Sequence, residues 1–140
     1  MVTKFLDFPN FGVIETILDD KIVNQLWELI DLAKENDITH NKNLAGNITS
    51  SLKMLDKNNI LMPVLMKLVS NYVKKYGVPY HVLRTGNFST EFLLDSLWVN
   101  FQNENEFNPI HTHTGAFSFV IWMQIPTNHE DQRNISIAKN

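Results

Sequence analysis

The sequence contains no cysteine and only two arginines, Arg84 and Arg133, among its 140 residues. The absence of cysteine excludes disulfides and Cys-ligated zinc or iron-sulfur sites, so histidine, carboxylate or amide groups must supply the ligands of any metal. The formal net charge is −3 and the lysines are scattered. Because phosphate binding needs a clustered basic surface, this distribution argues against nucleic acid as a partner.

Long hydrophobic runs are also missing. No segment is continuously apolar over the thickness of a bilayer, and the first residues lack the apolar core and cleavage site of a secretion signal. We therefore expect a cytoplasmic protein with no membrane partner. An apolar share of 44% with 19% charged residues is typical of globular proteins. The length favours a single domain over residues 1–140.

The first half of the chain shows mainly helical patterns. A short strand is expected at 13–18, after a turn that contains proline and glycine. Apolar residues then recur at helical spacing over 19–36 and again over 57–76, which predicts two helices, the second with its stripe in the core. The Asn-, Thr- and His-rich stretch 37–51 has neither period and predicts a loop beside a functional site.

The second half has the alternation of β-strands. Residues 92–102 and 110–125 are expected to form two strands separated by a turn at 103–106, the second strand covered on both faces. Residues 135–138 are expected to begin another. Helices followed by strands predict an α+β protein, with helical support at about 19–76 and strands at about 92–140.

Two histidines are the clearest candidates for chemistry. His111 and His113 are two residues apart, so on a strand they project from one face and direct two imidazole nitrogens toward one point. Neutral imidazole binds Fe, Zn, Cu and Ni, although a catalytic metal generally needs a third protein ligand. A bare His-x-His also occurs as two ordinary polar residues at the start of a strand. Its place after a strand that ends in Trp98, Asn100 and Gln102 favours the wall of a polar cavity.

Other metal proteins use the same pair. A typical cupin follows His-x-His with a glutamate four or five residues later, where this chain has Phe117 and Ser118. A cupin-like metalloprotein, or a zinc hydratase, would need a third histidine, for which His81 and His129 are the candidates. These alternatives stay open on the residues alone.

The tryptophan, the amides and the histidines also form one pattern of fixed order and spacing over residues 98–126. This pattern resembles a compact branch of the Fe(II)- and 2-oxoglutarate-dependent oxygenases that is often found in phage and marine microbial sequences. The resemblance implies that N-terminal helices pack on a double-stranded β-helix, or jelly-roll. Its residues are Trp98, Val99, Asn100, Phe101, Gln102, Asn108, His111, His113, Ser118 and Pro126.

The resemblance implies Fe(II) as the metal, with His111 as its first ligand. His113 then occupies the position where most of the superfamily has Asp or Glu, and a neutral imidazole there leaves the metal with a higher net charge. The implied activity is a dioxygenase reaction, the hydroxylation of a small-molecule, amino-acid or peptide substrate with 2-oxoglutarate as cosubstrate. The resemblance does not identify that substrate.

The same resemblance suggests residues around the cosubstrate. Asn100 and Gln102 are candidates for hydrogen bonds to 2-oxoglutarate, and Trp98 or Trp122 for the walls of its pocket. Ordinary cross-strand packing explains these residues equally well.

The rest of the family pattern is missing from the sequence. A distal histidine ligand and a basic residue for the far carboxylate of 2-oxoglutarate normally come several strands later, and His129 and Arg133 lie too close to the pair for these roles. We expect that the chain is part of a longer protein, that another chain completes the site, or that the β-helix is a degenerate, non-catalytic binding or assembly module. An incomplete barrel exposes a sheet edge, which favours a homo-oligomer or a completing chain as partner.

Overall fold

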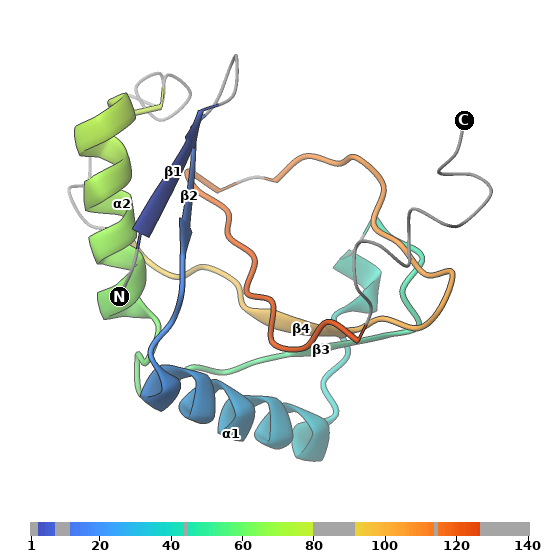
Figure 1. Ribbon diagram of the computed structural model, residues 1–140. Coiled ribbons are helices and arrows are strands. Elements are labelled where there is room, and N and C mark those ends of the chain that lie inside the picture. Colours follow the sequence, from blue (N-terminus) through green and yellow to red (C-terminus); the bar gives the residue numbers. More distant parts are fainter. Residues whose placement is uncertain (1–2, 8–11, 44, 80–91, 114, 127–140) are drawn as a thin grey trace.

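Figure 1 shows the computed structural model of the chain, which describes residues 3–7, 12–43, 45–79, 92–113 and 115–126. The strands form two antiparallel pairs, β1–β2 and β3–β4. Within these ranges no helix is long and apolar enough to cross a membrane. The double-stranded β-helix stays a prediction. In chain order the elements are β1 (Thr3–Asp7), β2 (Gly12–Thr16), α1 (Asp20–Asn36), the 3-10 helix η1 (Asn41–Asn43), β3 (Ser50–Lys53), α2 (Met62–Tyr76) and β4 (Trp98–Phe101).

Helix α1 confirms the first predicted helix and organises the core. Asp19 occupies its N-cap position, and the helix ends at Asn36 because Asp37 turns into the left-handed conformation with φ 47°. The amide of Asp37 then donates a 3.0 Å hydrogen bond to the carbonyl of Ala33. This arrangement satisfies one of the carbonyls that a helix end leaves without a partner.

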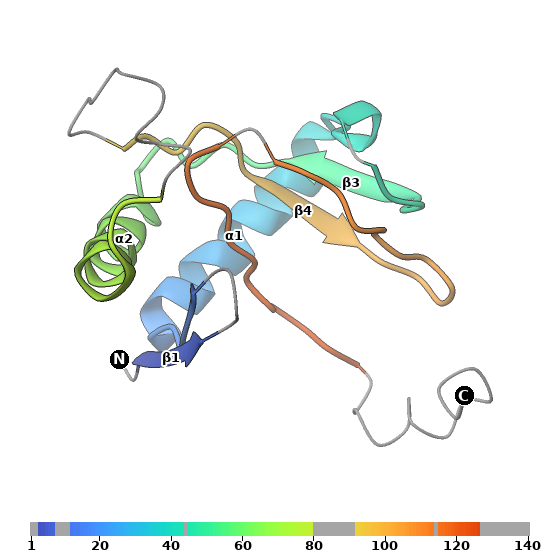
Figure 2. The same cartoon turned by 90° about the horizontal axis from the view of Figure 1, so that it is seen from above.

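The hydrophobic core lies between α1 and one face of the β3–β4 sheet. Figure 2 shows β3 and β4 side by side above α1. Because side chains alternate along a strand, Val99 and Phe101 of β4 point to this core, and Trp98 and Asn100 lie on the opposite face. The buried members of the core are Leu26, Leu29, Ile30, Ala33, Leu52, Met54 and Leu61.

Helix α2 begins five residues later than its apolar stripe predicts, at Met62 rather than at Lys57. Pro63 occupies the first turn, where its missing N–H does no harm. The turn before the helix is held by Asp56, whose two carboxylate oxygens accept hydrogen bonds of 2.8 and 2.9 Å from the amides of Ile60 and Leu61. The turn therefore replaces the first part of the predicted helix.

The apolar stripe over 57–76 was predicted to be core, and its first part is, since Leu61 is buried and Leu65 packs against the core, but no residue within α2 itself is fully buried. The rest of the stripe faces other parts of the chain. The helix lies against the β1–β2 hairpin, where the Tyr76 ring contacts the Phe5 ring at 6.3 Å between centroids. Tyr72 makes an edge contact with Phe117 at 5.4 Å, and Phe117 makes another with Phe92. These rings form a second apolar cluster that joins α2 to the chain after the histidine pair.

The strand predictions for the second half were partly wrong. Regular strand in 92–102 is confined to β4, and residues 110–113 and 115–125 form no strand. Ile121 and Met123 do pack against the core, whereas Val120 is 71% exposed and Trp122 is 75% exposed, so this segment is covered on one side only. Among the described residues, no strand is paired with this segment in a hydrogen-bonded ladder. The predicted strand 135–138 lies outside the described residues.

The turn at 103–106, which was predicted, is tied to the loop before β3 by Glu106. One carboxylate oxygen accepts hydrogen bonds from the amide and hydroxyl of Thr49, and the other accepts one of 2.9 Å from the Asn103 amide. The hydrogen bond from the Asn103 backbone and then that from the Thr49 side chain lower the pKa of Glu106 below its ordinary value of 4.5.

This lowered pKa predicts the pH dependence of the contact. Because folding depresses the pKa of Glu106, the contact is complete above the ordinary value of 4.5 and is lost as the pH falls through the lower folded value. In an NMR pH titration, the amide protons of Thr49 and Asn103 should move together at this lower pH. Glu106→Gln should abolish the movement, and Glu104→Gln should leave it unchanged. Amide shifts that ignore pH in this range would contradict the assignment.

Candidate metal site

Both histidines of the predicted pair lie on an irregular segment that is held at its two ends. Before them, the Asn47 amide donates a 2.9 Å hydrogen bond to the Phe107 carbonyl, and the Phe107 amide returns one of 3.3 Å. After them, Phe117 enters the aromatic cluster on α2. Figure 1 shows the segment between these anchors arching over the β3–β4 sheet. The histidines were predicted on a strand, but their place comes from the two anchors.

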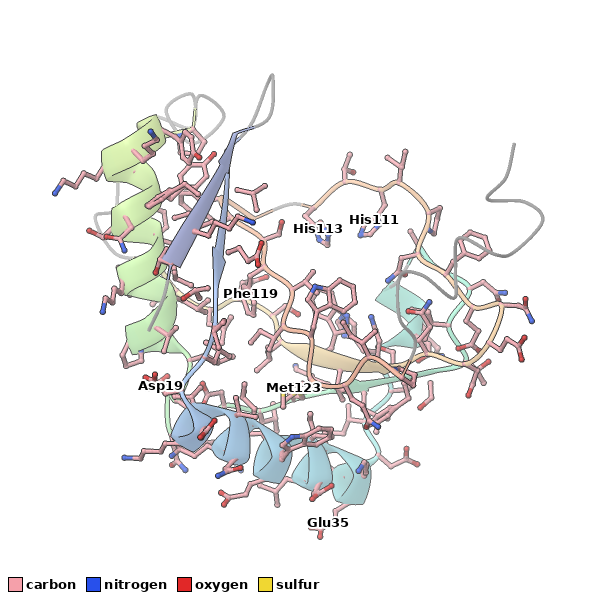
Figure 3. The ribbon with its side chains drawn as sticks, viewed as in Figure 1. Asp19, Glu35, His111, His113, Phe119 and Met123 are labelled. Carbon is pink, nitrogen blue, oxygen red and sulfur yellow. The ribbon has the colours of Figure 1, made fainter. Side chains whose placement is uncertain are left out.

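The rings of His111 and His113 nevertheless converge. Their Nε2 atoms lie 2.9 Å apart, and the rings meet edge to face with centroids 4.6 Å apart. Figure 3 shows both side chains on the inner side of the arch, where both residues are exposed. The two histidines of the predicted pair therefore lie together, although on an irregular backbone and not on the predicted strand.

The protonation of His111 follows from its second contact. Its Nδ1 atom lies 2.7 Å from the carbonyl oxygen of Pro109. Because a carbonyl only accepts hydrogen bonds, Nδ1 must carry the proton, and in the neutral ring the lone pair is then on Nε2. Metal-bound histidines have this same arrangement, with the outer N–H held by a carbonyl or carboxylate.

The separation of the two Nε2 atoms favours one coordination geometry. Two ligand atoms at neighbouring corners of an octahedron, each about 2.1 Å from the metal, lie about 3 Å apart, whereas two corners of a tetrahedron lie about 3.4 Å apart. The observed 2.9 Å between His111 and His113 fits the octahedral pair. A hydrogen bond from the Nε2–H of His113 to the Nε2 of His111 has the same length in the metal-free protein.

The sheet beneath the pair carries a stack of flat rings. The indole of Trp98 lies 6.5 Å from the His113 ring at an interplanar angle of 27°, and 4.8 Å from the His40 ring at 17°. His40 is 9% exposed, and its amide donates a 2.8 Å hydrogen bond to the Ser51 carbonyl in β3. Burial, followed by the nearby Lys53 cation, lowers the pKa of His40, so its ring is neutral at neutral pH.

The sequence alone did not single out His40. The signal that was present is the polar loop 37–51, which was expected to border the site. The structure shows why it does so. Thr39 forms a β-bridge with Leu52, which places the next residue, His40, on the same side of the sheet as Trp98.

The predicted cosubstrate residues occupy three different surroundings. Asn100 lies on the same face of β4 as Trp98, and its side-chain oxygen accepts a 2.8 Å hydrogen bond from the buried Ser51 hydroxyl. The Gln102 amide instead donates to the backbone carbonyl of Glu106 within the turn. Trp122 is largely exposed. Of the three, Asn100 shares the sheet face over which the histidines arch.

A third metal ligand is not found among the described residues, in which no group of three His, Asp or Glu side chains comes together. The earlier candidates His81 and His129, and the basic residue Arg133, lie outside those ranges. The described part of the candidate site therefore offers two imidazole nitrogens, those of His111 and His113. Comparisons with protein families, with curated proteins and with solved structures find no match to this chain.

Gly46 allows the first anchor of the arch to form. A Cβ atom on Gly46 would overlap the Asn108 side chain and lie 2.9 Å from the Phe107 carbonyl oxygen. Gly46→Ala should therefore push residues 107–108 away and destabilise the protein by about 1–3 kcal/mol, as overpacking does elsewhere. Urea unfolding measures the loss, and the exposed neighbour provides a control, since Ala45→Ser should change stability by less than about 0.5 kcal/mol. Equal stability of the two variants would disprove the close approach.

Proposed function

We propose that this chain carries the metal-binding part of a non-haem Fe(II)- and 2-oxoglutarate-dependent oxygenase that hydroxylates a C–H bond. The observation that supports this proposal is the convergence of His111 and His113, whose Nε2 atoms lie 2.9 Å apart and could both bind one metal ion. Octahedral coordination with open positions suits Fe(II) in oxygenases and differs from the tetrahedral coordination of structural zinc.

The donor set fits Fe(II) in part. His111 provides a lone pair at Nε2 because its Nδ1–H is held by the Pro109 carbonyl. His113 is the second ligand in the proposed site, in the place where a carboxylate is usual for the superfamily. Metal sites of this class need a third protein ligand, whether a histidine or a carboxylate. In this protein it would come from residues outside the described ranges or from another chain.

When bound, Fe(II) would couple the oxidation of a substrate C–H bond by O2 to the conversion of 2-oxoglutarate into succinate and CO2. The residues of the chain would bind and orient the reactants. Asn100 would hydrogen-bond a carboxylate of 2-oxoglutarate through its Nδ2–H groups, since its Oδ1 already accepts from Ser51. Gln102 and Trp122 stay predictions as cosubstrate contacts. A small molecule, an amino acid and a peptide all remain candidate substrates.

One observation favours a second function. The described residues bring together only two ligands, which is also what a non-catalytic binding or assembly module would keep after losing the rest of the site. A cupin-like metalloprotein would keep the pair and add a histidine. Metal binding without succinate formation, in the presence of 2-oxoglutarate and O2, would separate these functions from the oxygenase.

Metal binding by the pair is directly testable. Purified protein should bind Mn(II), a redox-stable substitute for Fe(II), and His111→Ala should weaken this binding more than about 100-fold, because a second-shell contact alone is often worth 10–100-fold. Thr112→Ala is the matched control, since it changes the residue between the ligands without removing a nitrogen donor. Anaerobic electron paramagnetic resonance titration measures free Mn(II). If His111→Ala binds Mn(II) as the wild type does, the pair is not the metal site.

Turnover tests the remaining part of the proposal. With Fe(II), ascorbate, O2 and 2-oxoglutarate, the wild type should form succinate above the level of its His111→Ala variant, even without the substrate, because such oxygenases slowly decarboxylate the cosubstrate alone. Succinate is quantified by mass spectrometry. Mn(II) binding with no difference in succinate between the two proteins would favour the non-catalytic or cupin-like function.

A further inference from the structure

The two proposed ligands are held in different ways. The His111 ring is oriented by the hydrogen bond from its Nδ1 to Pro109. For His113, the described residues provide no hydrogen bond to Nδ1, and its ring contacts are His111 on one side and Trp98 on another. A metal ligand with a free outer nitrogen needs some other group to set the orientation of its ring.

The contact with Trp98 leads to a rigid part of the molecule. Trp98 belongs to β4, where it is paired with Lys53 of β3. The other ring on the indole, His40, is buried and is bonded through its amide to the Ser51 carbonyl of β3. The stack of His40, Trp98 and His113 thus connects the β3–β4 sheet to a ligand on a segment without secondary structure.

We propose that His40 and Trp98 are positioning residues of the metal site, which hold the His113 imidazole in its ligating orientation by ring stacking in place of a hydrogen bond. This inference rests on the proposed metal function. Stacked rings with centroids 4.5–7 Å apart attract each other beyond the effect of their buried area. His40 limits the movement of the indole, and the indole limits the rotation of the His113 ring.

The electrostatics of the stack agree with this role. Because the pKa of His40 is lowered by burial and by Lys53, the His40 ring is uncharged at neutral pH and adds no second cation beside the metal. Lys53 is a cation, so its charge opposes protonation of the His40 ring. The stack therefore acts on His113 through its shape and not through an ion pair.

The first measurement uses the protein without metal. In the wild type, the ring current of Trp98 should shift the His113 ring protons upfield in the NMR spectrum, and the chain has only five histidines to assign. His40→Leu removes the flat ring but keeps an apolar side chain of similar size. This variant should reduce the His113 shift and leave the His111 ring protons unchanged, since Pro109 still orients that ring. His40→Phe keeps a flat ring and should preserve both signals.

The second measurement is the Mn(II) titration of the same variants. His40→Leu should weaken Mn(II) binding about 10-fold or more, as the loss of a second-shell contact does, and His40→Phe should bind within about 3-fold of the wild type. A general loss of stability would affect both variants, whereas rescue by the phenylalanine requires the stacked ring. Circular dichroism reports whether each variant folds. Should His40→Leu not fold, Trp98→Phe replaces it, because its smaller ring weakens both contacts and keeps the core face of β4.

The outcomes separate this inference from the proposed function. If the wild type binds Mn(II) and His40→Leu binds it equally well, the positioning role is disproved and the metal site stands. Equal weakening by His40→Leu and His40→Phe also disproves it, because stacking then has no part in the effect. A wild type that binds no Mn(II) disproves the metal function, and the positioning role with it, whatever the His113 signals show.

Discussion

The register of β3 against β4 is the constraint on which the rest of the structure depends. Leu52 is paired with Val99, and both lie on the face that packs against α1. The pairing of Ser51 with Asn100 lies on the opposite face, together with Trp98. Because the side-chain period of a strand is two, a slip of one residue would expose the core residues and bury the polar ones. The burial of apolar surface on α1 therefore determines which residues face the histidine pair.

The site is built by contacts between distant parts of the chain. The loop before β3 holds residues 107–108 through the Asn47 bridge and the Glu106 carboxylate, and it places His40 on Trp98. The segment with the histidines has no ladder of its own, so its conformation depends on these anchors and on Phe117. This arrangement would suit the proposed metal centre, since the hydrogen-bonded sheet lies beneath the short arch that carries the two histidines.

The ability of His111 to bind a metal through Nε2 depends on which of its two ring nitrogens carries the proton. A histidine ligates a metal through the nitrogen that carries the lone pair, and the Pro109 carbonyl assigns the proton of His111 to the other nitrogen. His113 has a ring neighbour in the equivalent role. In the proposed site the two imidazoles would be oriented in two different ways, His111 by a hydrogen bond and His113 by stacking. A site with two neutral ligands would leave the charge of a divalent metal to be balanced by an anionic cosubstrate or a further ligand.

Sequence patterns gave correct predictions where the structure depends on contacts between residues that are close in the sequence. The apolar periodicity over 19–36 predicted α1 closely, and the strand expected at 92–102 contains β4. Sequence patterns predicted the structure less well where it depends on hydrogen bonds between segments that are far apart in the sequence. Residues 110–113 and 115–125 alternate as a strand does, yet they form none in the described structure, because alternation does not supply a neighbouring strand with which to form hydrogen bonds. In α2 the apolar stripe continues into the turn, which Asp56 and Pro63 reshape.

The features of the candidate site also fall into those that the sequence predicts and those that depend on the tertiary structure. The sequence by itself determined that His111 and His113 are the residues to consider, since no cysteine is present and the spacing of two histidines is a local property. Only the tertiary structure decided that their Nε2 atoms converge and that the Pro109 carbonyl accepts a hydrogen bond from Nδ1 of His111. It also decided that His40 stacks on Trp98 beside the site. The physical reason is that a ring's orientation depends on contacts from segments far away along the chain, which no local pattern records.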